Sequence, residues 1–228
     1  MIPSVLKKWL GIPCPCPNPK SIFIGLIGGV GDLIAAAPSV IALKKKYPEA
    51  RITFGVGDGI FFNTIKSDPN IDQFDTPFFY NVWKKSHRWY TYRQKSQNHD
   101  LVLLLDNPNR DWWKDKKHLV DIYAEKCGVH LEQRRPILYL NDNDLKEAQD
   151  KLDQLGILNT DKLLILAPET RSKKEMKEWP VERILELIQK INQNHDCKII
   201  TFVSKDSPND YSGTIQLNGF PLGPSSAM

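Results

Sequence analysis

The sequence predicts an α/β fold with two Rossmann-like units, each built on a parallel β-sheet. Short, wholly apolar segments alternate with longer segments whose apolar residues recur at helical spacing. Segments that are apolar on both sides, such as Ile22–Ile27, are typical of parallel strands covered by helices on both faces. The alternation begins again after a charged helical segment near residue 140. One unit therefore precedes that segment, and a second follows it.

The first unit is predicted to open with strand Ile22–Ile27 and helix Asp32–Tyr47, whose last turn carries lysines where the helix dipole favours cations. The later elements are strand Arg51–Val56, helix Ile60–Ser67, strand Ile71–Phe74, helix or loop Val82–Gln97, strand Leu101–Leu105 and helix His118–Cys127, capped by Gly128. The expected core residues are Ile22, Ile24, Leu26, Ile52, Phe54, Leu101, Leu103 and Leu105.

The second unit is expected to follow a linker helix within NDNDLKEAQDKLDQLG. Its predicted elements are strand Leu163–Ala167, helix Val181–Asn192, strand Lys198–Val203 and a weaker strand at Thr214–Leu217. We therefore divide the chain into an N-terminal extension (1–19), a first unit (20–140) and a linker helix with a second unit (141–228). The second unit has too few strands for a complete sheet, so we expect the natural domain to be longer.

Composition and charge exclude several classes of protein. No segment approaches the roughly 18 apolar residues of a membrane-spanning helix, and the N-terminus lacks the features of a signal peptide. The four cysteines are too few and scattered for a disulfide scaffold or a zinc site. The net charge, 31 − 27 = +4, does not suggest a nucleic-acid partner. We expect a cytoplasmic protein with free thiols and no metal.

The first strand-to-helix turn, GLIGGVGDLIAAAP, has the composition of a ligand-binding turn. Gly28, Gly29 and Gly31 allow tight backbone angles and close approach of a ligand to a helix N-terminus. The spacing is not the dinucleotide fingerprint, because Ile34 stands where the third glycine belongs. The turn therefore favours a ligand other than a dinucleotide.

Asp32, at the start of the predicted helix, has two interpretations. As an N-cap it accepts hydrogen bonds from the first helical turn. As a functional residue it lies at the carboxyl end of the first strand, where open α/β sheets bind ligands, and acts as a general base. The spacing alone leaves both open.

The segment APETRSKKEMKEWPVERI forms a second candidate site, between a predicted strand and a predicted helix. Thr170, Arg171 and Lys177 combine hydroxyl and cationic groups that suit a phosphate. Trp179 is expected to anchor the loop and Pro180 to lie in the first helical turn. The alternative is a solvated basic loop, partly neutralised by its own glutamates.

Four segments together carry a resemblance to a known family. They are IGLIGGVGDLIAAAPSVIALKKKYPEARITFGVGD, SDPNIDQ, HDLVLLLDNPNRD and LLILAPETRSKKEMKEWPVERILELIQKI, in that order. In order, spacing and strand context they resemble glycosyltransferase family 9, the heptosyltransferases of lipopolysaccharide core assembly. The family's late donor motif, an acidic residue followed by a Gly-containing turn and a His, is absent before Met228. We therefore interpret the chain as a C-terminally truncated copy.

The resemblance implies a GT-B fold, in which the N-terminal Rossmann-like domain binds the acceptor and the C-terminal one binds the sugar nucleotide. It implies a metal-independent, inverting sugar transfer with no cofactor, in which the donor is a nucleotide-sugar such as ADP-heptose. Asp32 matches the family's catalytic base and Lys177 a donor-phosphate lysine. Thr170 and Arg171 are the further donor-binding residues, and Gly28, Gly29 and Gly31 form the acceptor-side loop.

Basic and aromatic residues gather in Val82–Lys117, and this composition suits an anionic glycolipid acceptor. A solvated helix face with some core tryptophans, or a site for single-stranded nucleic acid, are the alternatives. Met1–Leu10 combines apolar residues with Lys7 and Lys8, so peripheral contact with the inner membrane surface is one interpretation beside a packed or frayed terminus.

The sequence therefore leaves three functions open. The leading one is a heptosyltransferase-like glycosyltransferase. The second is a truncated, non-catalytic remnant or acceptor-binding module, in which the 228-residue chain has no turnover. The third is a nucleotide-dependent oxidoreductase, which the glycine spacing disfavours.

Overall fold

The computed structural model describes residues 16–26, 28–57, 59–77, 85–105, 117–170 and 174–220. The chain divides into two compact units, Met1–Tyr139 and Leu140–Met228. Within the described ranges, every helix is too short or too polar to cross a bilayer. The N-terminal extension, including Met1–Leu10, lies outside the described residues.

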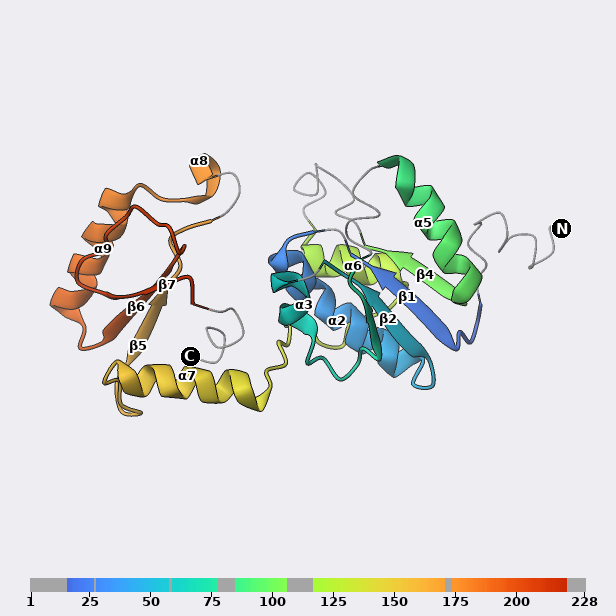
Figure 1. Ribbon diagram of the computed structural model, residues 1–228, viewed down its shortest axis with the longest axis horizontal. Helices are drawn as coiled ribbons and strands as arrows, with labels where there is room; N and C mark the ends of the chain where they lie inside the picture. The colour runs from blue at the N-terminus through green and yellow to red at the C-terminus, as the bar shows by residue number, and fades with distance from the viewer. Residues whose placement is uncertain are drawn as a thin grey trace. The chain divides into compact units, whose positions relative to one another are not determined.

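The first unit contains a parallel sheet, as predicted. Its strands are β1 (Ser21–Gly25), β2 (Arg51–Gly55), β3 (Gln73–Asp75) and β4 (Leu101–Leu104), in the order β3-β2-β1-β4 (Figure 1). Ile22 of β1 is aligned with Ile52 on one side and with Leu101 on the other. β1 is therefore an interior strand with a neighbour on each edge.

Helices cover both faces of this sheet. α2 (Val30–Lys46) and α6 (Leu119–Cys127) pack against each other and share one core cluster with Ile22 and Ile24. Phe23 faces the other way, toward the end of α5 (Lys85–Asn98), where Lys95 Nζ lies 5.1 Å from its ring centroid. The side chains of Ile22, Phe23 and Ile24 are wholly buried. The short helix α3 (Ile60–Ile65) lies between β2 and β3 in the chain.

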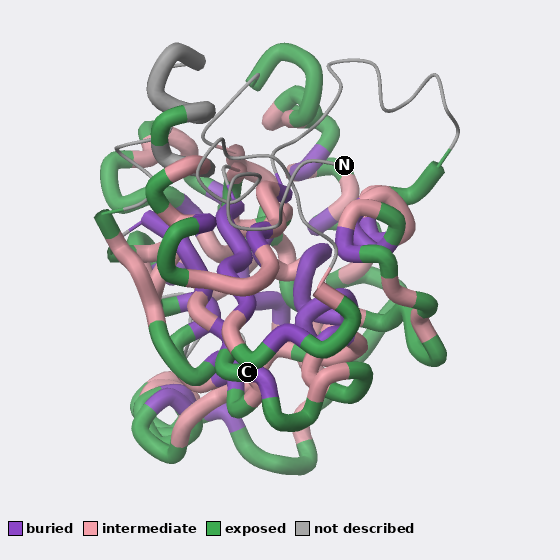
Figure 2. Tube along the Cα trace, turned by 90° about the vertical axis from the view of Figure 1, so that its right-hand side faces the viewer, coloured by how far each residue is buried: buried purple, intermediate pink, exposed green. Residues whose placement is uncertain are grey.

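The second unit is a smaller parallel sheet of β5 (Leu163–Leu166), β6 (Lys198–Val203) and β7 (Ile215–Asn218), paired in that order. On one face, α9 (Val181–Asn194) buries Ile184 and Ile188 against Ile199, Val203 and Tyr211. On the other face, Ile157, just after α7 (Asp142–Gln154), packs with Ile200 and Leu217. In Figure 2 the buried stretches are purple, and the exposed helix faces and loops are green.

The first helix differs from the prediction at its start. α2 begins at Val30, two residues before Asp32, because the carbonyl of Gly29 already accepts the backbone N–H groups of Asp32 (3.0 Å) and Leu33 (3.2 Å). Gly29 is thus the N-cap and Asp32 is the third helical residue. The interpretation of Asp32 as the N-cap is wrong.

Two of the predicted core residues are only partly buried. Leu101 and Leu103 pack against the core without being enclosed, because β4 is the last strand in the order of the described sheet. On this strand Val102 is the more buried residue, with 9% of its surface exposed. The other six predicted core residues are buried.

The position of β1 predicts a difference in stability between two truncations. Ile24→Ala should lower the free energy of unfolding by about 2–5 kcal/mol, because it opens a cavity between β1 and α2. Leu103→Ala should cost clearly less, since that side chain is partly exposed. Urea unfolding followed by circular dichroism measures both, and equal losses would contradict the assigned strand order.

Candidate functional site

The glycine turn after β1 is shaped by close contact rather than by unusual backbone angles. Gly28, Gly29 and Gly31 all avoid the left-handed region, and Gly29 has φ −82° and ψ 179°. None of these three glycines therefore uses the left-handed region that favours glycine. A Cβ built on Gly28 would lie 2.6 Å from both Cβ and Cγ of Asp32, whereas one on Gly31 would meet nothing within 4 Å. Gly28 is required because the Asp32 side chain occupies the space beside it.

The Asp32 carboxylate is held by two hydrogen bonds. Its Oδ2 accepts the backbone N–H of Gly29 at 2.6 Å, and its Oδ1 accepts the hydroxyl of Tyr123 at 3.1 Å. Among the described residues no cation forms an ion pair with it, and the side chain is half-buried. Each carboxylate oxygen has two lone pairs, so each can accept one further hydrogen bond.

The position of Asp32 in the first turn of α2 also favours its negative charge. Unpaired N–H groups make a helix N-terminus positive, and an acidic side chain there gains about 0.3–1 kcal/mol. The carboxylate is therefore held at the carboxyl end of β1 by the helix start and its two hydrogen-bond donors.

The basic loop after β5 is organised by two glutamates. The backbone N–H of Thr170 donates to Glu178 Oε1 at 2.6 Å. Glu169 accepts the backbone N–H of Ser204 at 2.9 Å, the Ser207 hydroxyl, and Asn209 Nδ2 at 3.4 Å. Burial alone raises the pKa of Glu169, but these hydrogen bonds outweigh it and hold the pKa below its ordinary value.

The two described lysines of this loop have no ion-pair partner among the described residues. α8 (Lys174–Lys177) is exposed, and in the part of the loop that the structure describes neither Lys174 nor Lys177 forms an ion pair. Glu169 and Glu178 are turned toward backbone and hydroxyl donors instead. Two ammonium groups therefore remain available to an anion.

Two residues of this loop, Trp179 and Pro180, differ from the sequence predictions. Trp179 is 64% exposed, so it does not anchor the loop. Pro180 is the N-cap of α9 rather than a residue of its first turn. Arg171 lies outside the described residues. The structure brings Thr170 and Lys177 into one loop at the carboxyl end of β5.

Sequence reasoning missed Tyr123 and the partners of Glu169. Tyr123 is 91 residues from Asp32, and no local pattern indicates the contact. Ser207 and Asn209 had a usable signal, because they follow β6, the strand paired with β5. Loops that follow neighbouring parallel strands meet at the same edge of a sheet.

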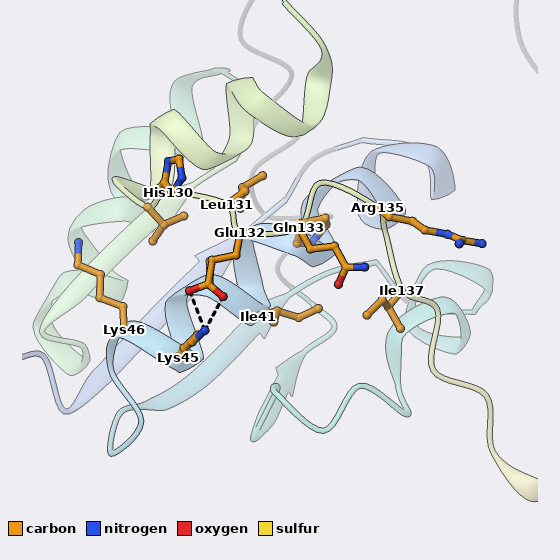
Figure 3. Close-up of a pocket in the computed structure, with 12 residues that line it drawn as sticks. Ile41, Lys45, Lys46, His130, Leu131, Glu132, Gln133, Arg135 and Ile137 are labelled. Carbon is orange, nitrogen blue, oxygen red and sulfur yellow. Dashed lines mark hydrogen bonds and ion pairs between the residues drawn. The ribbon is translucent and has the colours of Figure 1, made fainter.

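A groove of about 350 Å³ lies at the other end of α2, against residues 129–137. Figure 3 shows Lys45 paired with Glu132 across it, with Nζ–Oε distances of 2.7 and 2.5 Å. This hydrogen-bonded lysine lowers the pKa of the Glu132 carboxyl. None of the predicted site residues lines the groove, and Lys45 is about 20 Å along the helix from Asp32.

In the segment Val82–Lys117, most of the basic and aromatic side chains lie outside the described ones, although Tyr90 is 61% exposed and Lys117 pairs with Glu125 at 2.7 Å. Within the described ranges, no three His, Cys, Asp or Glu side chains are grouped so that they could hold a metal ion.

Each of the two units contains a parallel sheet, and in each a candidate functional residue, Asp32 or Lys177, follows the first strand. This arrangement defines an α/β protein of the GT-B-like class. The particular fold is that of solved glycosyltransferase family 9 and heptosyltransferase structures. Each of three such structures matches 91% of this chain.

A family 9 glycosyl transferase from Veillonella parvula matches with 19% identity, a TM-score of 0.70 and 72% of its own length covered. The E. coli ADP-heptose lps heptosyltransferase II matches with 12% identity, a TM-score of 0.58 and 75% covered. The E. coli heptosyltransferase WaaC with ADP-2-deoxy-2-fluoro heptose matches with 15% identity, a TM-score of 0.54 and 79% covered. These likenesses establish the fold.

The sequence itself has no such matches. No protein-family model matches the chain, and no curated protein matches its sequence.

The glycine turn predicts opposite responses to two alanine substitutions. Gly28→Ala should lower the free energy of unfolding by about 1–3 kcal/mol, because the new Cβ displaces the Asp32 side chain. Gly31→Ala is the matched control, and it should be neutral or slightly stabilising because alanine is a better helix former. Thermal unfolding of both variants measures this, and a tolerated Gly28→Ala would contradict the close packing of Asp32.

Proposed function

We propose that the protein is a glycosyltransferase that moves a sugar, heptose, from a nucleotide-diphospho-sugar to a hydroxyl of a lipopolysaccharide-core-type acceptor. The observation that carries the proposal is the fold, which is shared with three solved glycosyltransferases, two of them heptosyltransferases by name. An oriented carboxylate in the first unit and exposed cations in the second support it. The proposed transfer inverts the anomeric centre and uses neither a metal nor a cofactor.

Asp32 is the proposed general base. Its carboxylate takes the proton from the acceptor hydroxyl as that oxygen attacks the anomeric carbon of the donor. The two hydrogen bonds to the carboxylate orient it, and the remaining lone pairs are available for the proton. Gly28, Gly29 and Gly31 form the proposed acceptor-side loop around it.

Lys177 is the proposed partner of the donor diphosphate. Its exposed ammonium group meets charge that is present in the bound donor and grows as the nucleoside diphosphate leaves. Thr170 and Arg171 are the further proposed donor-binding residues. Asp32 and Lys177 belong to different units of the chain.

The proposed partners and location follow from these substrates. The proposed acceptor is an anionic glycolipid, and the proposed location is the cytoplasm, at the cytoplasmic face of the inner membrane. The protein is proposed to work there, with no nucleic-acid partner.

Donor specificity is the direct test of the proposal. Titration with ADP-heptose and with UDP-sugars, read by calorimetry, should give binding of the ADP-sugar alone. Radiolabelled sugar should then be transferred to a lipopolysaccharide-core acceptor. Acceptor binding without donor binding or transfer would favour the non-catalytic module instead.

Asp32→Asn should lower kcat by about 10²–10⁴-fold, because the amide keeps the shape of the side chain but has no basicity. The melting temperature should change little, since the amide oxygen still accepts one of the two hydrogen bonds. The control is Asp142→Asn, an exposed first-turn aspartate of α7, which should leave transfer unchanged. Near-normal turnover in Asp32→Asn would make Asp32 a residue that only stabilises the helix start.

Lys177→Ala should weaken donor binding and slow transfer together, because the lysine meets charge present in both the ground state and the transition state. A tenfold or larger rise in the donor Kd is expected by calorimetry. The control is Lys162→Ala, an exposed lysine that precedes β5 and so lies at the opposite end of that strand. Unchanged donor affinity in Lys177→Ala would remove this lysine from the donor site.

A further inference from the structure

A buried tyrosine of α6 contacts the carboxylate proposed as the catalytic base. Tyr123 has 0% of its surface exposed, and its hydroxyl donates to Oδ1 of Asp32 at 3.1 Å. The two residues are 91 positions apart, so the contact exists only because α6 packs against α2. The hydrogen bond therefore depends on the tertiary fold.

Packing alone does not account for the hydroxyl. Tyr123 belongs to the main core cluster, with Val120 and Cys127 of the same helix, where a phenylalanine ring would fill the same space. A buried hydroxyl is unfavourable unless it has a hydrogen-bond partner, and a carboxylate is a strong one. Asp32 provides such a partner for this hydroxyl.

The interface that holds Tyr123 is closely packed. One turn further along α6, burial raises the pKa of the Cys127 thiol to about 12, so the thiol stays protonated. Side chains in such an interior keep a single arrangement because they interdigitate closely. The hydroxyl of Tyr123 is therefore a fixed donor rather than one that samples several positions.

We infer that Tyr123 is a positioning residue that sets the orientation of the Asp32 carboxylate for proton transfer; this inference rests on the proposed function. The Gly29 N–H fixes Oδ2, and the Tyr123 hydroxyl fixes Oδ1. Together they stop rotation about the Cβ–Cγ bond and leave the remaining lone pairs to meet the acceptor hydroxyl. The missing side chain of Gly28 leaves room for this arrangement.

Tyr123→Phe tests the inference, because it removes the donor and keeps the ring. We expect kcat to fall about tenfold, which corresponds to the loss of one hydrogen bond to a charged group, while the donor KM is unchanged. A residue that only packs would not produce this combination.

A second measurement needs no substrate. In the ligand-free protein, the Gly29 amide should exchange its hydrogen several-fold faster in Tyr123→Phe, because the carboxylate that accepts it is free to rotate. The control is Tyr47→Phe, which removes a hydroxyl at the other end of α2 and should change neither Gly29 exchange nor kcat.

The outcomes separate this inference from the proposed function. If Tyr123→Phe has wild-type kcat and Gly29 exchange while Asp32→Asn is inactive, the positioning role is wrong and the base stands. Faster exchange throughout the first unit would also overturn the inference, because it would indicate general loosening. Normal turnover in Asp32→Asn would refute the proposed base itself.

Discussion

The complete burial of β1 is the constraint on which the first unit depends. Ile22, Phe23 and Ile24 point to alternate faces of the sheet, and none of them has any exposed surface. A strand of this kind must have a neighbour on each edge and a cover on each face. β2 and β4 provide the neighbours, while α2 with α6 on one face and the end of α5 on the other provide the cover. Since α2 follows β1 directly, its first turn lies at the carboxyl end of the central strand.

This placement has an electrostatic consequence at Asp32. A carboxylate in the first turn of a helix is stabilised by the N–H groups around it, and here one of them, from Gly29, is only 2.6 Å away. The same close approach excludes a side chain at Gly28. Gly28 and Asp32 therefore occur together in this turn for one physical reason. The Asp32 side chain folds back onto the backbone that precedes the helix, and a side chain at position 28 would occupy the same space.

Most strands of both units could be predicted from the sequence because they are short apolar segments between polar residues. The predicted bounds of Lys198–Val203 are those of β6, and most others differ by one or two residues. The start of α2 could not be predicted, because it depends on which carbonyl accepts the first helical hydrogen bonds. The exposure of Leu103 and Trp179 depends on what neighbours them in space, and the spacing of apolar residues does not contain that information. The Tyr123 hydrogen bond was beyond sequence reasoning for the same reason.

Asp32 and the lysines of α8 have equivalent positions in their units, but their side chains carry opposite charge. Each follows the first strand of a parallel sheet, β1 or β5. In the first unit the acidic side chain is held by donors, which keeps a carboxylate in a defined orientation. In the second unit the acids Glu169 and Glu178 accept from backbone and polar side-chain groups, so the lysines of α8 have no ion-pair partner in the described residues. One strand end thus presents an oriented carboxylate and the other presents exposed lysines, and the proposed transfer from a diphosphate donor to a hydroxyl would use both.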